Sequence, residues 1–301
     1  MRTRVVGILA AAAVSLSGCS GSSKAGDPAS PADTVRVVAS TDVYGDIAKT
    51  IGGDAVTVTS VIDDPAKDPH SYEADAQTQL ALTKAQVVIE NGGGYDEFMD
   101  TMLKSARQQP TLINVTELSG YNTQPADGEF NEHLWYDFPT VAKLATQLGT
   151  AFSAAAPSHS GTIAANVTAF QRKLQSLEKQ EATAKAGKAA TGVAITEPVP
   201  LYLLTACGFE NRTPPEFSEA IEEDTDVAPG VLKQTLDLFD THRVELLVYN
   251  DQTGGPQTEA VLAAAQKNNV PAVPVAETLP TGKTYLSWMS ENVAAICGGG
   301  Q

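Results

Sequence analysis

Short apolar segments alternate with amphipathic segments along most of the chain. In its first half, runs rich in β-branched residues are separated by segments whose apolar residues recur every three or four positions, as in helices. We expect strands at 35–40, 56–61, 87–91 and 111–115, and helices at 43–51, 74–84 and 95–107. Strand, helix and strand in succession are typical of an α/β unit with a parallel sheet. Residues 34–156 are therefore expected to form a first α/β lobe.

A second run of the same kind occupies the last third of the chain. Its predicted strands are 192–196, 244–249 and 272–275, and its predicted helices are 199–206, 215–222, 231–241, 257–267 and 285–296. Residues 190–301 are expected to form a second α/β lobe. The expected fold class is thus α/β, with two lobes that each contain a mostly parallel sheet flanked by helices.

A helical segment at 157–189 lies between the two lobes. Residues 158–188 contain no proline, and their apolar residues follow helical spacing: Ile163, Val167, Phe170, Leu174 and Leu177. One helix of this length spans about 40 Å at ~1.5 Å per residue, enough to run along both lobes as a rigid connection. Such a connection differs from the flexible strands of hinge-closing binding proteins. A long surface helix without this role is the alternative that the pattern leaves open.

The N-terminus has the pattern of an export signal. Arg2 and Arg4 precede a short apolar stretch that ends in Leu16-Ser17-Gly18-Cys19, which predicts a signal peptide at 1–18, too short to span a bilayer. The cysteine after the cleavage point resembles a bacterial lipobox, so we expect lipid on Cys19 and anchoring to the outside of the cell membrane. An ordinary signal with an incidental cysteine is the alternative. Residues 19–33 are rich in Ser, Gly, Ala and Pro and are expected to form a flexible tether.

Composition narrows the function classes. The chain has 20 Lys and Arg against 36 Asp and Glu, a net charge of −16, which argues against a nucleic-acid partner. If Cys19 carries lipid, two of the three cysteines remain, Cys207 and Cys297, and the exported protein holds them in an oxidising compartment. They form either a disulfide or two buried thiols, since sequence alone does not bring them together.

The four histidines differ in their surroundings. His70 lies on a loop beyond the second predicted strand, and His133 follows a loop rich in Gly, Pro and Asp. Proteins with parallel sheets bind their ligands beyond the carboxyl ends of the strands, which makes His70 a candidate. His133 is the second candidate, and a core or surface role fits each of the two alone. His159 and His242 lie at predicted helix ends and are assigned structural roles.

Two carboxylates fall at corresponding places in the second lobe. Glu197 and Glu277 each follow a predicted strand, although Glu197 also suits the start of a helix. Together with His70 and His133 they would line a cleft and bind a divalent cation. Imidazole and carboxylate suit zinc, manganese or iron, and the absence of a thiolate argues against copper(I). Asp251 is a reserve ligand, an acceptor for an imidazole N–H, or a turn cap.

Five motifs occur in an order that resembles one known family. They are Asp68-Pro69-His70-Ser71-Tyr72-Glu73, Asn91-Gly92-Gly93-Gly94-Tyr95, His133-Leu134-Trp135-Tyr136-Asp137, Thr196-Glu197-Pro198-Val199 and Thr284-Tyr285-Leu286-Ser287-Trp288-Met289. In this order the chain is similar to the zinc- or manganese-binding lipoproteins of bacterial metal-uptake ABC transporters, which include streptococcal metal-binding adhesins. The resemblance covers nearly all of residues 35–297.

The resemblance implies one transition metal, zinc or manganese, held between two lobes and passed to a membrane permease. His70 and His133 match the two ligands of the first lobe. Glu197 matches the third position, where members have His or Glu, and Glu277 replaces the usual Asp. His133 follows Asn131-Glu132 rather than Asp-Pro, and residues 119–130 lack the His-rich loop of many zinc-specific members.

These observations predict a monomeric, lipid-anchored solute-binding protein with no catalytic cycle. The alternatives are a secreted metallohydrolase and an adhesin with a structural metal. No HExxH or GxSxG motif supports a hydrolase. The triple glycine at 92–94 favours close backbone approach to the cleft and does not match a nucleotide-binding loop.

Overall fold

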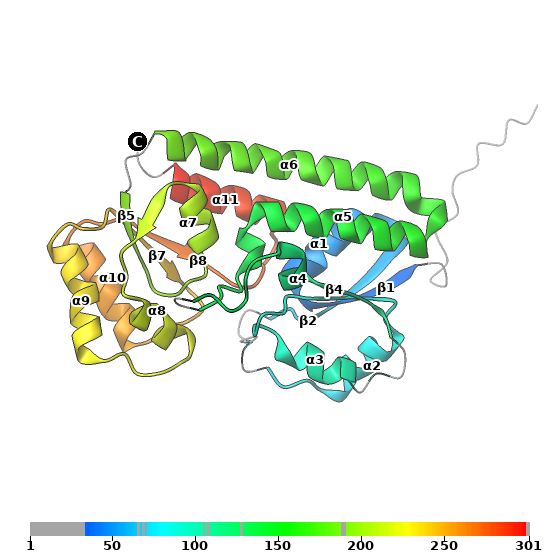
Figure 1. Ribbon diagram of the computed structural model, residues 1–301, viewed down its shortest axis with the longest axis horizontal. Helices are drawn as coiled ribbons and strands as arrows, with labels where there is room; N and C mark the ends of the chain where they lie inside the picture. The colour runs from blue at the N-terminus through cyan, green and yellow to red at the C-terminus, as the bar shows by residue number, and fades with distance from the viewer. Residues whose placement is uncertain are drawn as a thin grey trace, which may run out of the picture.

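Two α/β lobes lie side by side under one long helix in the computed structural model (Figure 1). It describes residues 34–64, 67, 70, 72–104, 106, 109–126, 129–187 and 191–298. The predicted signal peptide, the tether and the lipidation site Cys19 lie outside the described residues. No helix in the described part of the chain combines the length and apolar surface that a bilayer crossing requires.

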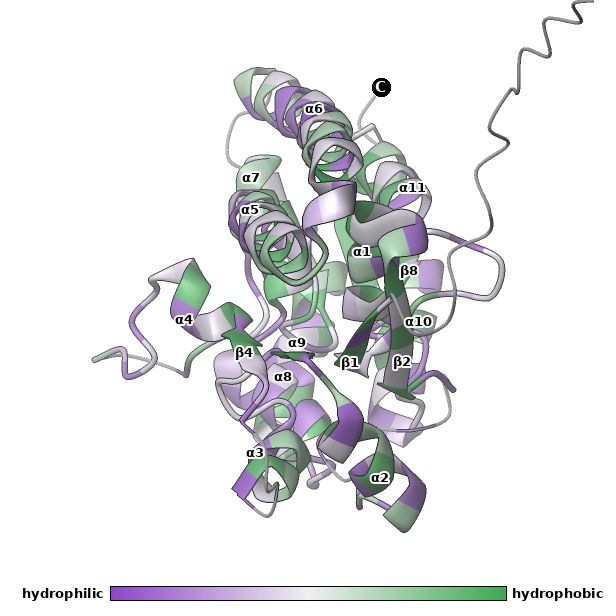
Figure 2. Cartoon of the chain, turned by 90° about the vertical axis from the view of Figure 1, so that its right-hand side faces the viewer, coloured by the Kyte–Doolittle hydropathy of each residue, from purple (hydrophilic) through white to green (hydrophobic). Residues whose placement is uncertain are grey.

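The first lobe is built on a parallel sheet of order β2-β1-β3-β4. Its strands are β1 (Val35–Thr41), β2 (Val56–Ile62), β3 (Val87–Glu90) and β4 (Thr111–Asn114), and its crossover helices are α1 (Asp42–Gly52), α2 (Ala76–Lys84) and α3 (Glu97–Lys104). Helix α1 covers one face of the sheet, and α2 and α3 cover the other (Figure 2). Both faces are covered, which explains the nearly continuous apolar sequences of β1 and β3.

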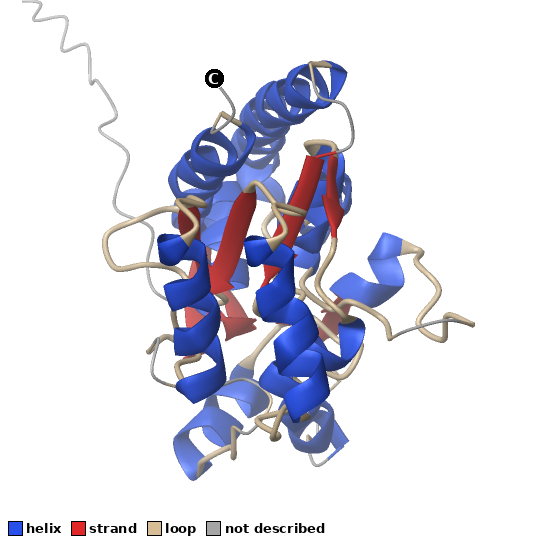
Figure 3. Ribbon diagram, turned by 90° about the vertical axis from the view of Figure 1, so that its left-hand side faces the viewer, coloured by secondary structure: helices blue, strands red, loops and turns tan. Residues whose placement is uncertain are grey.

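The second lobe repeats this plan, with a parallel sheet of order β6-β5-β7-β8. Its strands are β5 (Thr191–Ile195), β6 (Phe209–Asn211), β7 (Leu246–Asn250) and β8 (Ala272–Val275). Its helices are α7 (Leu201–Ala206), α8 (Pro215–Glu222), α9 (Pro229–Asp240), α10 (Pro256–Lys267) and α11 (Tyr285–Cys297). Figure 3 shows helices on both sides of this sheet. The predicted two-lobed α/β fold is confirmed.

Helix α6 (Ser160–Ala186) is the predicted long helix, and a short 3-10 turn (Pro157–His159) precedes it. Its apolar stripe is buried at Ile163, Phe170, Leu174 and Leu177. The helix packs on α1 and α5 (Phe138–Ala155) of the first lobe and on α7 and α11 of the second. It therefore joins the two lobes along their length, as Figure 1 shows.

The lobes also share one continuous apolar core, which includes Trp135 from the first lobe and Tyr285 and Met289 from α11. Hydrogen bonds cross the same boundary. The Tyr285 hydroxyl donates to the Trp135 carbonyl oxygen at 2.7 Å, and the Tyr136 hydroxyl donates to the Ala276 carbonyl oxygen at 2.9 Å. Each fully buried aromatic contributes about 1.5–3 kcal/mol, so this boundary is held firmly.

The structure differs from the predicted elements in several places. Strand β4 ends at Asn114, one residue before the predicted end, because the Asn114 side chain accepts from the Glu117 amide and starts α4 (Val115–Ser119). Helix α3 starts at Glu97 instead of residue 95, since residues 93–96 form a turn. Helix α5 and strand β6 were not predicted.

Cys207 and Cys297 form a disulfide between the ends of α7 and α11, with Cα atoms 5.6 Å apart. The bond closes a loop across 90 residues of sequence. It ties α11 to the rest of the second lobe.

Candidate metal centre

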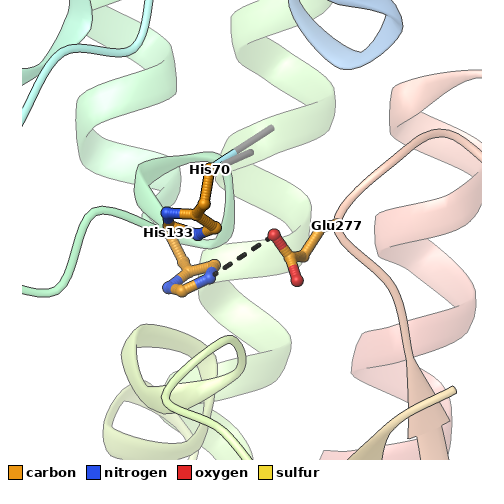
Figure 4. Close-up of side chains that lie close together, drawn as sticks. All are labelled: His70, His133 and Glu277. Carbon is orange, nitrogen blue, oxygen red and sulfur yellow. Dashed lines mark ion pairs between the residues drawn. The ribbon is translucent and has the colours of Figure 1, made fainter. Parts of the chain in front are cut away.

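Three predicted ligands converge between the lobes. His70 lies beyond β2, His133 directly precedes a 3-10 turn (Leu134–Tyr136), and Glu277 follows β8. One ligand atom from each lies within 4.8 Å of the other two. Figure 4 shows both imidazoles facing the carboxylate of Glu277. The site thus forms where the carboxyl ends of the two parallel sheets meet, as expected for α/β folds.

The His133 ring is fully buried and fixed in orientation. Its Nδ1 lies 2.7 Å from Oδ1 of Asn131, and the backbone N–H of His133 donates to the same oxygen. The Asn131 amide nitrogen donates to the Pro198 carbonyl oxygen, which fixes the orientation of the amide. Because Oδ1 only accepts, Nδ1 carries the proton and Nε2 keeps its lone pair, 3.9 Å from Oε2 of Glu277.

Burial, with a further contribution from His70, holds the pKa of His133 well below its ordinary value of 6.5. A neutral imidazole is the form that binds metal. Aromatic rings shield this position: Trp135 and Tyr95 lie 5.1 and 6.1 Å from the His133 ring, centroid to centroid. The environment therefore keeps His133 ready to act as a ligand at neutral pH.

Asn250 links the two carboxylates of the second lobe. Its side-chain amide donates to Oε1 of Glu277 at 2.8 Å and to Oε2 of Glu197 at 2.6 Å. Both glutamates are buried, 9% and 2% exposed. Glu197 is not in the described groups whose ligand atoms lie within 4.8 Å of one another. The side chain of Asn250 connects it to Glu277.

The sequence analysis missed two further carboxylates at the site. Oε1 of Glu222 lies 3.6 Å from Nε2 of His133, and Glu132 and Glu222 form a second close group with His70. Burial, then the nearby Glu132, Glu197 and Glu277, raises the pKa of Glu222 to about 9. The only sequence signals were the position of Glu132 next to His133 and the acidic end of α8.

The remaining candidates lie outside these groups. Asp251 is exposed, and its backbone N–H donates to the Val275 carbonyl oxygen. The acceptor beside Nδ1 of His133 is Asn131 instead. His159 precedes α6, and His242 lies in the turn after α9. Among the described residues, none of these three belongs to a close group of ligands.

The glycine turn adopts the predicted backbone conformation, with φ of +72° at both Gly92 and Gly93. A Cβ at Gly93 would lie 2.5 Å from the Phe130 ring and 2.9 Å from Oγ1 of Thr116. Glycine is therefore required for the turn to pack against the loop that leads to His133.

Two imidazoles and several carboxylates, contributed by two lobes, are the kind of donor set that divalent transition metals prefer. Residues 37–299 match the family described as "ZnuA: Zinc-uptake complex component A periplasmic". The chain belongs to this family of substrate-binding components of metal ABC transporters. The resemblance inferred from the ordered motifs is confirmed.

Three relatives that are named for a metal align with this chain over different fractions of their own length. The manganese-binding lipoprotein MntA of Bacillus subtilis (strain 168) is 30% identical over 182 residues, 60% of this chain and 58% of MntA. The manganese ABC transporter substrate-binding lipoprotein scaA of Streptococcus gordonii is 22% identical over 99% of this chain and 98% of its own length. The iron ABC transporter substrate-binding lipoprotein MtsA of Streptococcus pyogenes serotype M1 is 24% identical over 70% of this chain and 74% of its own.

Solved structures show the same fold. The periplasmic zinc-binding protein TROA from Treponema pallidum aligns with a TM-score of 0.72 at 18% identity, over 88% of this chain and 98% of TROA. The Mn-bound periplasmic metal-binding protein from Candidatus Liberibacter asiaticus aligns with a TM-score of 0.71 at 19% identity, over 88% of this chain and 99% of its own.

Proposed function

We propose that this protein captures one zinc or manganese ion between its lobes and delivers it to an ABC permease. The convergence of His70, His133 and Glu277 from opposite lobes within 4.8 Å is the observation that supports this most strongly. We further propose that Glu197 is the fourth ligand and that lipid on Cys19 anchors the protein outside the cell. The metal is cargo, and we assign the protein no catalytic step.

The charge of the site supports a divalent cation. His133 is neutral, while Glu197 and Glu277 are buried carboxylates held by one amide. Two ionised carboxylates balance a divalent charge, and the two imidazoles supply neutral donors. Nitrogen and oxygen donors of this kind suit zinc, manganese and iron, in agreement with the variety of metals named for the relatives.

The boundary between the lobes supports release through small movements. Helix α6 packs on both lobes, and α11 donates its Tyr285 N–H to Asp46 of α1 at 2.8 Å. A wide hinge opening would break these contacts and the shared core. His70 is the exposed member of the ligand set, so we expect the metal to leave past this loop.

Calorimetric titration of the stripped protein tests the proposal. Zinc and manganese are titrated separately into wild type, His133→Ala and His242→Ala. We expect one tight equivalent in wild type and His242→Ala, and its loss in His133→Ala with unchanged circular dichroism. No stoichiometric binding of either ion to wild type would refute the proposal. Loss of fold when a chelator removes the metal would indicate a structural site instead.

A further inference from the structure

A second group of ligands lies beside the first one, toward solvent. His70, Glu132 and Glu222 each offer a ligand atom within 4.8 Å of the other two, and His70 belongs to both groups. His70 is exposed and the two glutamates are partly exposed, whereas His133 and Glu277 of the first group are buried. The two groups thus share one imidazole and differ in depth.

The second group opens onto solvent through a pocket of about 790 Å³. His70, Glu132 and Glu222 all line it, and Glu129, Glu223 and Asp224 add three more acidic side chains. Among the described residues that line this pocket, none is a lysine or an arginine. An acidic pocket of this kind concentrates cations at its surface.

Glu222 lies at the end of its helix, where an ionised carboxylate is unfavourable. Glu222 is the last residue of α8, and Glu223 and Asp224 follow it directly. An ionised carboxylate at the carbonyl end of a helix meets the negative end of the helix dipole, which disfavours its charge. A divalent cation at this end would remove that repulsion.

His133 directs an unpaired ligand atom toward Glu222. Its Nε2 is fully buried, lies 3.6 Å from Oε1 of Glu222 and has no hydrogen-bond partner among the described residues. A buried polar atom left in this way is unfavourable unless a ligand satisfies it. Glu222 therefore connects the solvent-side group, to which it belongs, with the buried imidazole of the inner site.

We propose that His70, Glu132 and Glu222 form an outer divalent-cation site that receives the metal and passes it to the inner site. The inference rests on the proposed function. His70 stays a ligand in both positions, while the two glutamates are exchanged for His133 and Glu277. The side chains of the outer site thereby replace part of the water bound to the metal before the metal reaches the buried ligands.

Stopped-flow kinetics of the stripped protein tests this pathway with Mn²⁺ and Zn²⁺ as separate probes. Trp135 lies 5.1 Å from the His133 ring, so its fluorescence reports arrival at the inner site. The variants are Glu132→Gln and Glu222→Gln, with Glu223→Gln as the charge-matched control that lines the same pocket but belongs to neither group. Release is measured by mixing the loaded proteins with EDTA.

An outer site on the path slows uptake and release together. We expect both rates to fall about tenfold in Glu132→Gln and in Glu222→Gln, and much less in Glu223→Gln. The outer site would be overturned if the uptake and release rates were the same in all three variants. Faster release with unchanged uptake in Glu222→Gln would also overturn it and make Glu222 an inner ligand. A wild type that binds neither metal would overturn the proposed function itself.

Discussion

Oδ1 of Asn131 accepts a hydrogen bond from Nδ1 of His133 at 2.7 Å, which leaves Nε2 facing the carboxylates of the second lobe. The same Asn131 reaches across the lobe boundary to the Pro198 carbonyl oxygen. One side chain therefore sets both the tautomer of the proposed ligand His133 and its position relative to the opposite lobe.

We expect Asn131→Ala to weaken metal binding by about 10–100-fold, the usual effect of losing a residue that orients a ligand. Asn131→Asp keeps an acceptor beside Nδ1 and should retain most of the affinity. Competition titration against a chelator of known affinity measures both. Equal affinities in the two variants would show that the acceptor is not what Asn131 contributes.

Asn250 has the corresponding position among the carboxylates, since its amide donates to both Glu197 and Glu277. Asn250→Ala frees both carboxylates and should lower metal affinity by about 10–100-fold. Thr253→Ala removes only another acceptor of the same amide and serves as the control. The prediction fails if both variants bind as tightly as wild type in the same competition titration.

Glu181 makes the stability of the linking helix depend on pH. It is buried on α6, and burial, then Glu178 and Asp137, raises its pKa from 4.5 to about 8. The folded state therefore keeps a proton that the unfolded state releases, and stability falls as pH rises from about 4.5 to about 8. Glu181→Gln should unfold at the same urea concentration as wild type at pH 4.5, and at a higher one at pH 8. Parallel pH profiles of wild type and variant would contradict this assignment.

The disulfide between Cys207 and Cys297 should stabilise the fold without affecting the site. Replacing both cysteines with serine is expected to lower the free energy of unfolding by about 2–5 kcal/mol. Neither cysteine belongs to the close groups of ligands, so metal affinity should stay at the wild-type value. Urea denaturation and calorimetry on the same double variant test the two halves of this prediction.

The fold was predictable because its central strands are buried on both faces. Strands such as β1 and β3 are nearly uninterrupted runs of apolar and β-branched residues, bounded by helical periods. Helix α5 has apolar residues at helical spacing, Val141, Leu144, Leu148 and Phe152, so this helix too was predictable from the sequence. Strand β6 has three residues, too few to show a period.

The candidate site was predictable where residues follow strand ends. His70 and Glu277 have such positions, and His133 stood out through its motif. Glu222 could not be found in this way, because its sequence indicates only the end of a helix. The packing of α8 against the cleft, rather than any local pattern, brings its carboxylate to 3.6 Å from His133. The orienting roles of Asn131 and Asn250 likewise depend on tertiary contacts.

The most direct test is a crystal structure of the stripped protein soaked with one equivalent of manganese or zinc, with anomalous scattering to locate the metal. One peak is expected between the lobes, which for zinc lies about 2.0–2.2 Å from Nε2 of His133 and from a carboxylate oxygen of Glu277. His70 should be a further ligand. A metal bound only on the outer surface, with no peak beside His133, would show that these residues do not form the metal site.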